Sequence, residues 1–197
     1  MIVIPHTYEM EAKALNRAIQ MGSIKNSITK GRGNLAGFIG EEAFCAYTGA
    51  SIVMDKNMYD YDVVLNDDRI EIKTKRRTVK PKPNYDVSVA DTSTHQKPDE
   101  YVFISLEFGK VKTINKKQKV YNELKNVWLL GSKDAKEYFK QATKWDKGRV
   151  DISNNFTTLV DMWNLPISRL DDKYLDLYRQ LTFEDVGLDI PNDIYRH

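Results

Sequence analysis

Asp62, Glu71 and Lys73 are the residues of this chain whose types and spacing best fit a chemical role. Asp62 precedes the apolar segment 63–65, and turn-forming residues at 66–68 allow the next segment to fold back beside it as a hairpin. Side chains alternate across a strand, so Glu71 and Lys73 are expected on one face. Two carboxylates should therefore converge beside an ammonium group.

This grouping fits the hydrolysis of a phosphodiester bond. Carboxylate oxygens are hard ligands that suit Mg2+, and a nearby cation can orient the attacking water and stabilise the charge of the transition state. We expect Asp62 and Glu71 to bind the metal ion and Lys73 to act on the water. Asp60 shares a face with Asp62, so spacing alone leaves both open as the ligand.

The same residues resemble the signature of the PD-(D/E)xK nuclease superfamily. Asp62 is followed nine residues later by the Glu-Ile-Lys segment at 71–73, and a preceding helix carries the Gly-Glu pair at 40–41. Tyr61 stands where the signature has its Pro, a departure that is common in the superfamily. The resemblance covers about residues 34–108. More loosely, the segments at 127–131 and 164–170 look like parts of phage and bacterial proteins that have this nuclease core.

The resemblance implies a set of site residues, a cofactor and a substrate. In the superfamily the Asp and Glu bind metal, the Lys acts on water, and a helix Glu often completes the site. It favours Asp62 over Asp60, because the metal-binding Asp directly precedes an apolar run. The implied activity is endonucleolytic cleavage of DNA with Mg2+, for which Mn2+ should substitute. The implied catalytic residues are Asp62, Glu71, Lys73 and Glu41, and the implied metal ligands are Asp62, Glu71, Glu41 and the backbone carbonyl of Ile72.

Two arguments disagree about which helix carboxylate faces the site. A projection at ~100° per residue places Glu42 within the apolar arc of the helix expected over 34–48 and Glu41 to its side. The resemblance favours Glu41, because the Gly-Glu pair supplies the helix acid in relatives. We predict Glu41, and we expect a buried Glu42 to pair with Lys13 or Arg17 on the preceding helix.

Residues that follow the Glu-Ile-Lys segment are candidates for nucleic-acid contacts. Lys75, Arg76 and Arg77 belong to a basic run and are expected to contact phosphates. Gln96 follows a predicted strand, and in several relatives a Gln in this region supports the catalytic Lys or contacts the phosphate. RNA is not excluded as the substrate, and a homodimer is expected by analogy. The alternative function is a module with the nuclease fold that binds nucleic acid or assembles without cutting.

Hydrophobic periodicity predicts an α/β fold with a mixed-sheet sandwich. The resemblance implies that it has an αβββαβ restriction-endonuclease-like core, extended at both ends. We expect one domain over 1–197, with a core at about 34–145 and a C-terminal elaboration at about 146–197. Helices are predicted over 8–21, 34–48 and 132–142, and strands over 51–54, 59–65, 69–76, 85–90, 101–108, 126–130 and 156–160.

Composition narrows the function classes. The chain has 197 residues, 41% hydrophobic and 29% charged, with a net charge of +2, as in an ordinary globular protein. The single cysteine excludes an intrachain disulfide and a multi-cysteine zinc site, and the three histidines lack metal-ligand spacing. No apolar run reaches the ~18 residues of a membrane span, so we expect a cytoplasmic protein without membrane contact.

Overall fold

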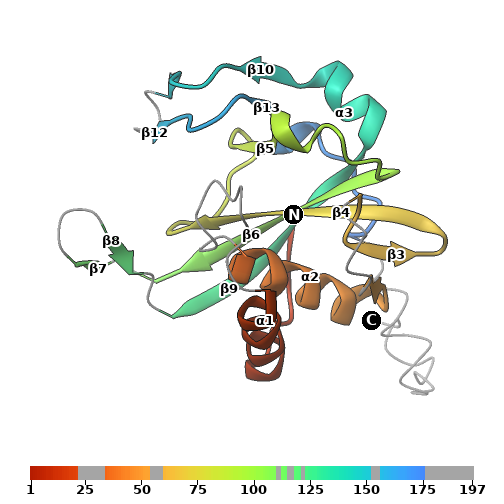
Figure 1. The fold of residues 1–197 in the computed structure, drawn as a ribbon, viewed down its shortest axis with the longest axis vertical. Helices are drawn as coiled ribbons and strands as arrows, with labels where there is room; N and C mark the ends of the chain where they lie inside the picture. The colour runs from red at the N-terminus through yellow and green to blue at the C-terminus, as the bar shows by residue number, and fades with distance from the viewer. Residues whose placement is uncertain are drawn as a thin grey trace, which may run out of the picture.

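Two helices form one layer of the molecule, and both begin and end where the sequence predicts (Figure 1). In the first, α1 (Tyr8–Met21), the Thr7 hydroxyl accepts a bond from the Met10 N–H at 3.3 Å. The second, α2 (Asn34–Thr48), is followed by Gly49 at a φ of 75°. The structure, a computed structural model, describes residues 1–21, 34–53, 60–109, 112–114, 118–120, 123–151 and 156–175.

A mixed sheet lies next to the helices and makes the fold α/β, as predicted. Its strand order is β1-β9-β6-β4-β3-β2, and every neighbouring pair is antiparallel except β4 and β6, which are parallel. The strands are β1 (Ile2–Ile4), β2 (Ser51–Ile52), β3 (Val63–Leu65), β4 (Asp68–Arg77), β6 (Glu100–Phe108) and β9 (Leu124–Asp134).

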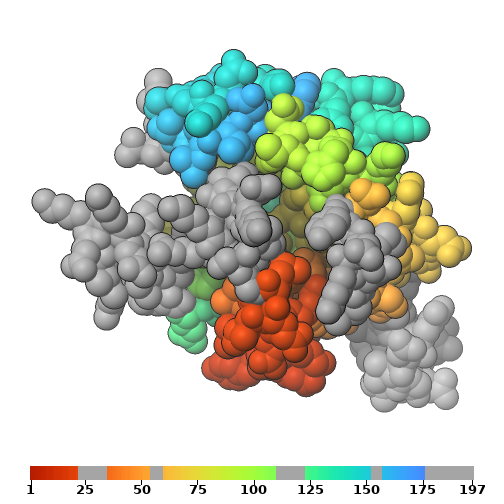
Figure 2. Space-filling model, in the orientation of Figure 1, coloured from red at the N-terminus to blue at the C-terminus, as the bar shows by residue number. Residues whose placement is uncertain are grey.

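A smaller sheet and α3 cover the other face of the mixed sheet. In the space-filling view they form the upper part of the molecule, with α1 and α2 below (Figure 2). The small sheet has the order β10-β13-β5 and joins segments far apart in the chain. The remaining elements are β5 (Asp86–Ala90), β10 (Thr143–Trp145), β13 (Met162–Pro166), α3 (Ala135–Gln141), the pairs β7 (Lys112–Ile114) with β8 (Gln118–Val120) and β11 (Val150–Asp151) with β12 (Phe156–Thr157), and the 3-10 turns η1 (Asp91–Ser93) and η2 (Ile167–Arg169).

The two faces of β6 pack into two separate hydrophobic cores. Val102 and Ile104 belong to the core beneath α2, whereas Tyr101 and Phe103 belong to the core beneath α3 and the small sheet. Each such fully buried side chain contributes about 1.5–3 kcal/mol. In the ladder between β4 and β6, Glu71 lies opposite Tyr101 and the residue two positions later lies opposite Phe103. The charged face of β4 therefore points toward the small sheet, and its apolar face packs on α2.

The predicted start of the third helix at residue 132 is wrong. Residues 131–134 continue β9 and pair with β6, and α3 begins only after Asp134, whose carboxylate caps it. Ser132 exchanges two backbone bonds with Asp171, at 3.0 and 2.8 Å, which hold this segment extended. A contact between residues 39 positions apart decides the boundary, and no local pattern in the sequence reports it.

The C-terminal part is more deeply integrated than the sequence predicts. The strand predicted over 156–160 is limited to β12, and β13 was not predicted. Since β13 lies between β10 and β5, residues expected as an elaboration supply the centre of the small sheet. The strand at β1 was also not predicted and pairs with β9 at the edge of the mixed sheet. No helix in the described part of the chain is both long and apolar enough to cross a membrane.

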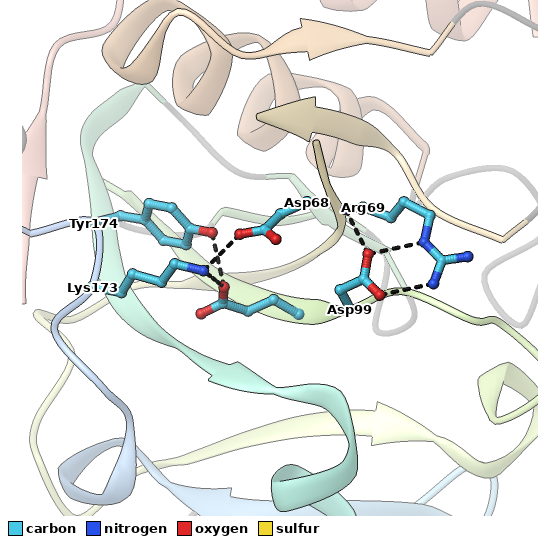
Figure 3. Close-up of polar contacts among 6 residues, drawn as sticks. Asp68, Arg69, Asp99, Lys173 and Tyr174 are labelled. Atoms are coloured by element: carbon cyan, nitrogen blue, oxygen red, sulfur yellow. Dashed lines mark hydrogen bonds and ion pairs between the residues drawn. The ribbon is translucent and has the colours of Figure 1, made fainter. Parts of the chain in front are cut away.

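A cluster of charged groups fastens residues 173–174 to the starts of β4 and β6 (Figure 3). The Lys173 ammonium donates to Glu100 at 2.6 Å and to Asp68 at 2.8 Å, and the Tyr174 hydroxyl donates to Glu100 at 2.8 Å. The Glu100 side chain is only 8% exposed, so it depends on these two donors. Nearby, Arg69 forms a two-pronged ion pair with Asp99.

Replacing Lys173 by Met is expected to lower the free energy of unfolding by about 1–3 kcal/mol, because it leaves the buried Glu100 carboxylate with Tyr174 alone. Denaturant unfolding measures the loss. Lys140→Met is the matched control, since its pair with Glu137 is exposed and its removal should change stability by less than about 0.5 kcal/mol. Equal losses in the two variants would contradict the assigned role of Lys173.

Gly40 lies where α2 crosses β4, and its lack of a side chain permits close packing. A Cβ atom there would overlap the Thr74 hydroxyl, which is buried without a hydrogen-bond partner in the described part of the chain. Gly40→Ala is expected to cost about 1–3 kcal/mol of stability in thermal unfolding. Adding Thr74→Ala should restore most of that stability. Gly37→Ala is the control, because its Cβ would meet no atom closer than 3.8 Å.

Candidate active site

Asp62 lies at the point where β3 and β4 separate. Its N–H donates to the Ile70 carbonyl at 2.9 Å, and its carboxylate accepts the Ile72 N–H at 2.7 Å. The side chain thus replaces the backbone acceptor that a continued ladder would supply to Ile72. As the sequence predicts, the hairpin holds the carboxylate against the middle of β4.

Glu71, Lys73 and Gln96 form a hydrogen-bonded network on the charged face of β4. The Lys73 ammonium donates to Glu71 Oε1 at 2.6 Å and to Gln96 Oε1 at 3.0 Å. The Gln96 amide donates to the same Glu71 oxygen at 2.9 Å. The turn after η1 delivers Gln96, so a residue predicted to support the Lys is brought into contact with it.

Glu41 approaches the site from α2. Arg17 of α1 donates to Glu41 at 2.6 Å and to Glu42 at 3.2 Å, and it also lies over the ring of Phe38 at 4.3 Å. The Glu41 side chain is the less exposed of the two carboxylates, at 9% against 13%. Arg17 was predicted as a partner for Glu42, and it binds both.

The electrostatics show that three carboxyl groups share one region. Burial raises the pKa of Asp62 well above its usual range, and the charges of Glu71 and Glu41 raise it further. The Ile72 N–H and Lys73 oppose this effect. Burial also raises the pKa of Glu41, against the influence of Arg17, and Glu71 adds to the rise. Negative charge is therefore in excess between α2, β3 and β4.

The carboxyl groups fit a hard divalent cation in chemistry and in charge. Glu71 Oε2 is buried and has no hydrogen-bond partner among the described residues. A bound cation would satisfy this oxygen and reduce the repulsion that raises the pKa of Asp62. In the part of the chain that the structure describes, no three Asp, Glu, His or Cys side chains are already arranged as a metal site. Asp62 and Glu41 are instead turned to Ile72 and Arg17.

The other predicted ligands are placed as follows. Asp60 is partly buried and acts electrostatically on Arg69 at the start of β4, whereas the Asp62 carboxylate binds the Ile72 N–H in the middle of β4. Ile72 buries its side chain in the core beneath α2, while its backbone N–H binds Asp62. Its backbone therefore lies at the site, as its predicted role as a carbonyl ligand requires.

The basic run predicted to contact phosphates is divided between two faces. β4 continues through residue 77, so Arg76 points away from Lys75 and Arg77. Lys75 is turned inward and donates to the Asp86 carbonyl at 3.0 Å and to the Ser88 hydroxyl at 2.7 Å. Arg77 donates to the same carbonyl at 3.1 Å. Strand alternation therefore places Lys75 and Arg77 on one face and Arg76 on the other, and the phosphate contacts expected of the three residues stay a prediction.

Ser88 and Asn164 were not identified from the sequence. The Ser88 hydroxyl accepts a bond from Lys75 and donates to the Asn164 side-chain oxygen, which connects β4 to β5 and β13 of the small sheet. A polar residue between Val87 and Val89 is the one local signal for Ser88. Asn164 gives no such signal, because its partner Ser88 lies on β5, far away in the chain.

Comparison with models of known protein families gives no match to this chain, and no curated protein matches it.

Proposed function

We propose that the protein is a Mg2+-dependent nuclease that hydrolyses DNA phosphodiester bonds. One observation supports this most strongly: Asp62, Glu71 and Glu41 bring excess negative charge together beside the Lys73 ammonium. Two carboxylates on neighbouring strands, with a lysine two residues after one of them, are the grouping that metal-assisted phosphodiester hydrolysis requires. The three carboxylates and the Ile72 carbonyl would hold the ion.

Each group has a distinct role in the proposed reaction. The bound ion supplies Lewis acidity and lowers the pKa of water. Lys73 orients the attacking water and stabilises the charge that develops on the phosphate. Gln96 fixes the positions of the Lys73 and Glu71 side chains through the hydrogen bonds of its amide group. Hydrolysis would then proceed in a single step, without a covalent intermediate on the protein.

The fold supports membership of the PD-(D/E)xK superfamily. The order α2, β2, β3, β4, β6 matches the first helix and the four strands of the αβββαβ pattern, with β4 and β6 parallel. Between these two strands the chain contains β5 and η1, in the place where the pattern has its second helix. Asp62 directly precedes β3, and the Glu-Ile-Lys segment lies on its antiparallel neighbour β4, an arrangement that supports the resemblance.

A cleavage assay tests the proposal directly. Purified protein is incubated with supercoiled, linear, single-stranded and four-way-junction DNA, and with RNA, in the presence of Mg2+, Mn2+, Ca2+ or EDTA. We expect cleavage of DNA with Mg2+ and with Mn2+, and none with EDTA. Cleavage that persists in EDTA, or no cleavage of any substrate with either metal, would overturn the proposal.

One observation favours the alternative, a module that binds nucleic acid without cutting. Arg17 engages Glu41 at 2.6 Å, so this carboxylate is already paired within the protein. Retention of DNA binding in the same samples, without cleavage under any metal condition, would support the alternative. The intact Asp62, Glu71 and Lys73 network makes the nuclease the better-supported function.

A further inference from the structure

We propose that the pocket between β4 and β5 binds a second phosphate group of the nucleic-acid strand, next to the phosphate that is cut. The pocket has a volume of about 180 Å³, and Lys73 forms part of its wall. The Lys75 and Ser88 side chains give it a polar side, and Phe103 and Leu130 give it an apolar one. That the pocket binds a phosphate group follows from its own residues. That this phosphate belongs to the nucleic-acid substrate rests on the proposed nuclease function.

The hydrogen bonds of the Lys75 ammonium leave it able to bind an anion. An ammonium has three N–H donors, and Lys75 uses two of them, on the Asp86 carbonyl and the Ser88 hydroxyl. Both partners are neutral. Among the described residues, no carboxylate lies within ion-pair distance of Lys75, which leaves its charge without a direct counter-ion.

Arg77 increases the positive charge at the same place. It donates to the Asp86 carbonyl that Lys75 also uses, and its Nε–H is buried without a partner in the described residues. Burial is the main cause that lowers the pKa of Lys75 to about 8, and repulsion from Arg77 is the second. The carboxylates of Asp86 and Asp151 act from greater distance in the opposite direction and do not cancel this effect. A bound anion would offset both the burial and the repulsion.

The position of the pocket relative to Lys73 determines which phosphate it would take. Lys73 and Lys75 lie on one face of β4, two residues and therefore about 6.6 Å apart along the strand. Neighbouring phosphates of one nucleic-acid strand can span such a separation. With the cut phosphate at Lys73, Lys75 would bind the phosphate next to it. That phosphate is either an internal phosphodiester or the terminal phosphate of a strand end.

Binding to a protein that cannot cut tests this pocket. The probes are inorganic phosphate and a short single DNA strand with or without a 5′-phosphate, titrated calorimetrically into Glu71→Gln protein. In the Lys75→Met version we expect affinity for phosphate to fall about 10-fold or more, because one charge-assisted hydrogen bond is lost. Ser88→Ala should give a smaller loss in the same direction. Lys82→Met is the matched control, since this lysine is exposed outside the pocket, and it should bind as before.

Stability separates a binding role from a structural one. Lys75 is an enclosed cation without a carboxylate partner, so Met in its place should leave the melting temperature unchanged or raise it. A lower melting temperature together with unchanged binding of all three probes would overturn the proposal. If the Glu71→Gln protein binds the strand more tightly when it has a 5′-phosphate, and Lys75→Met removes only that difference, the bound group is a terminal phosphate. An equal loss for both strands identifies an internal one.

The outcomes distinguish this inference from the proposed function. Phosphate binding that depends on Lys75, together with no cleavage of any nucleic acid by the wild-type protein, would reject the nuclease and retain the anion pocket. Cleavage with Mg2+ by a protein whose Lys75→Met variant binds every probe as before would retain the nuclease and reject the pocket. Failure of the Lys75-containing protein to bind any probe would also reject the pocket.

Discussion

Replacing Glu71 by Gln is expected to lower the rate of Mg2+-dependent DNA cleavage by about 10²-fold or more. Gln keeps the size of the side chain but removes the charge that binds the ion and pairs with Lys73 at 2.6 Å. Loss of this charge also removes a cause of the raised pKa of Asp62, so the fold should not be destabilised. Initial cleavage rates and a thermal unfolding curve on the same preparation measure both effects.

Two further variants test whether the loss of cleavage is specific to the candidate site. Glu137→Gln makes the same change in an exposed Glu–Lys pair and should cut at the wild-type rate. Lys73→Ala leaves the carboxylates in place, so it should lose cleavage to a similar extent while its affinity for Mg2+ is retained. A Glu71→Gln protein that cuts as fast as the wild type would show that the site has been assigned wrongly.

The parts of the fold that depend on local signals could be predicted from the sequence. The bounds of α1 and α2 follow from apolar periodicity together with Thr7 and Gly49 at their ends. Strand alternation on β4 correctly placed Glu71 and Lys73 on one face, and the hairpin brought Asp62 to the backbone N–H of the residue between them. These features need only residues close together in the chain.

The features that were missed depend on distant contacts. The start of α3 is set by the pairing of Ser132 with Asp171, and β13 forms only because β5 and β10 lie on its two sides. The inward turn of Lys75 likewise depends on Ser88 of β5. A short polar segment cannot report such partners, because the chain that covers it lies far away in the sequence.

The helical projection favours Glu42 as the inward carboxylate, yet the side chains of Glu41 and Glu42 are both largely buried, because α2 is covered around most of its circumference. α2 packs against α1 on one side and against β4 on another, and Ala36, Ile39 and Phe44 are all buried. A wheel assumes one apolar arc and one solvated arc. Where two elements cover a helix, a carboxylate on either side of the apolar arc can be buried. The residues that it contacts then determine whether it belongs to the site.

Glu41→Gln is expected to weaken Mg2+ binding and to slow cleavage by about 10²-fold, whereas Glu42→Gln should change both only slightly. The reason is electrostatic proximity. The charge of Glu41 raises the pKa of Asp62, and Glu71 in turn raises the pKa of Glu41. Glu42 is not among the main influences on Asp62, although it shares Arg17 with Glu41. Calorimetric titration with Mg2+ and cleavage rates measure the difference.

Glu42→Gln is a closely matched control, because it makes the same chemical change one residue further along α2. It also removes the charge of a carboxylate that binds the same Arg17 guanidinium. Both variants leave Arg17 with one carboxylate partner and with its contact over Phe38, so their stabilities should be similar. Any difference in metal affinity then reflects position relative to Asp62 and Glu71. Impaired metal binding in Glu42→Gln together with normal binding in Glu41→Gln would assign the helix carboxylate to Glu42 and would require α2 to turn about its axis when the ion binds.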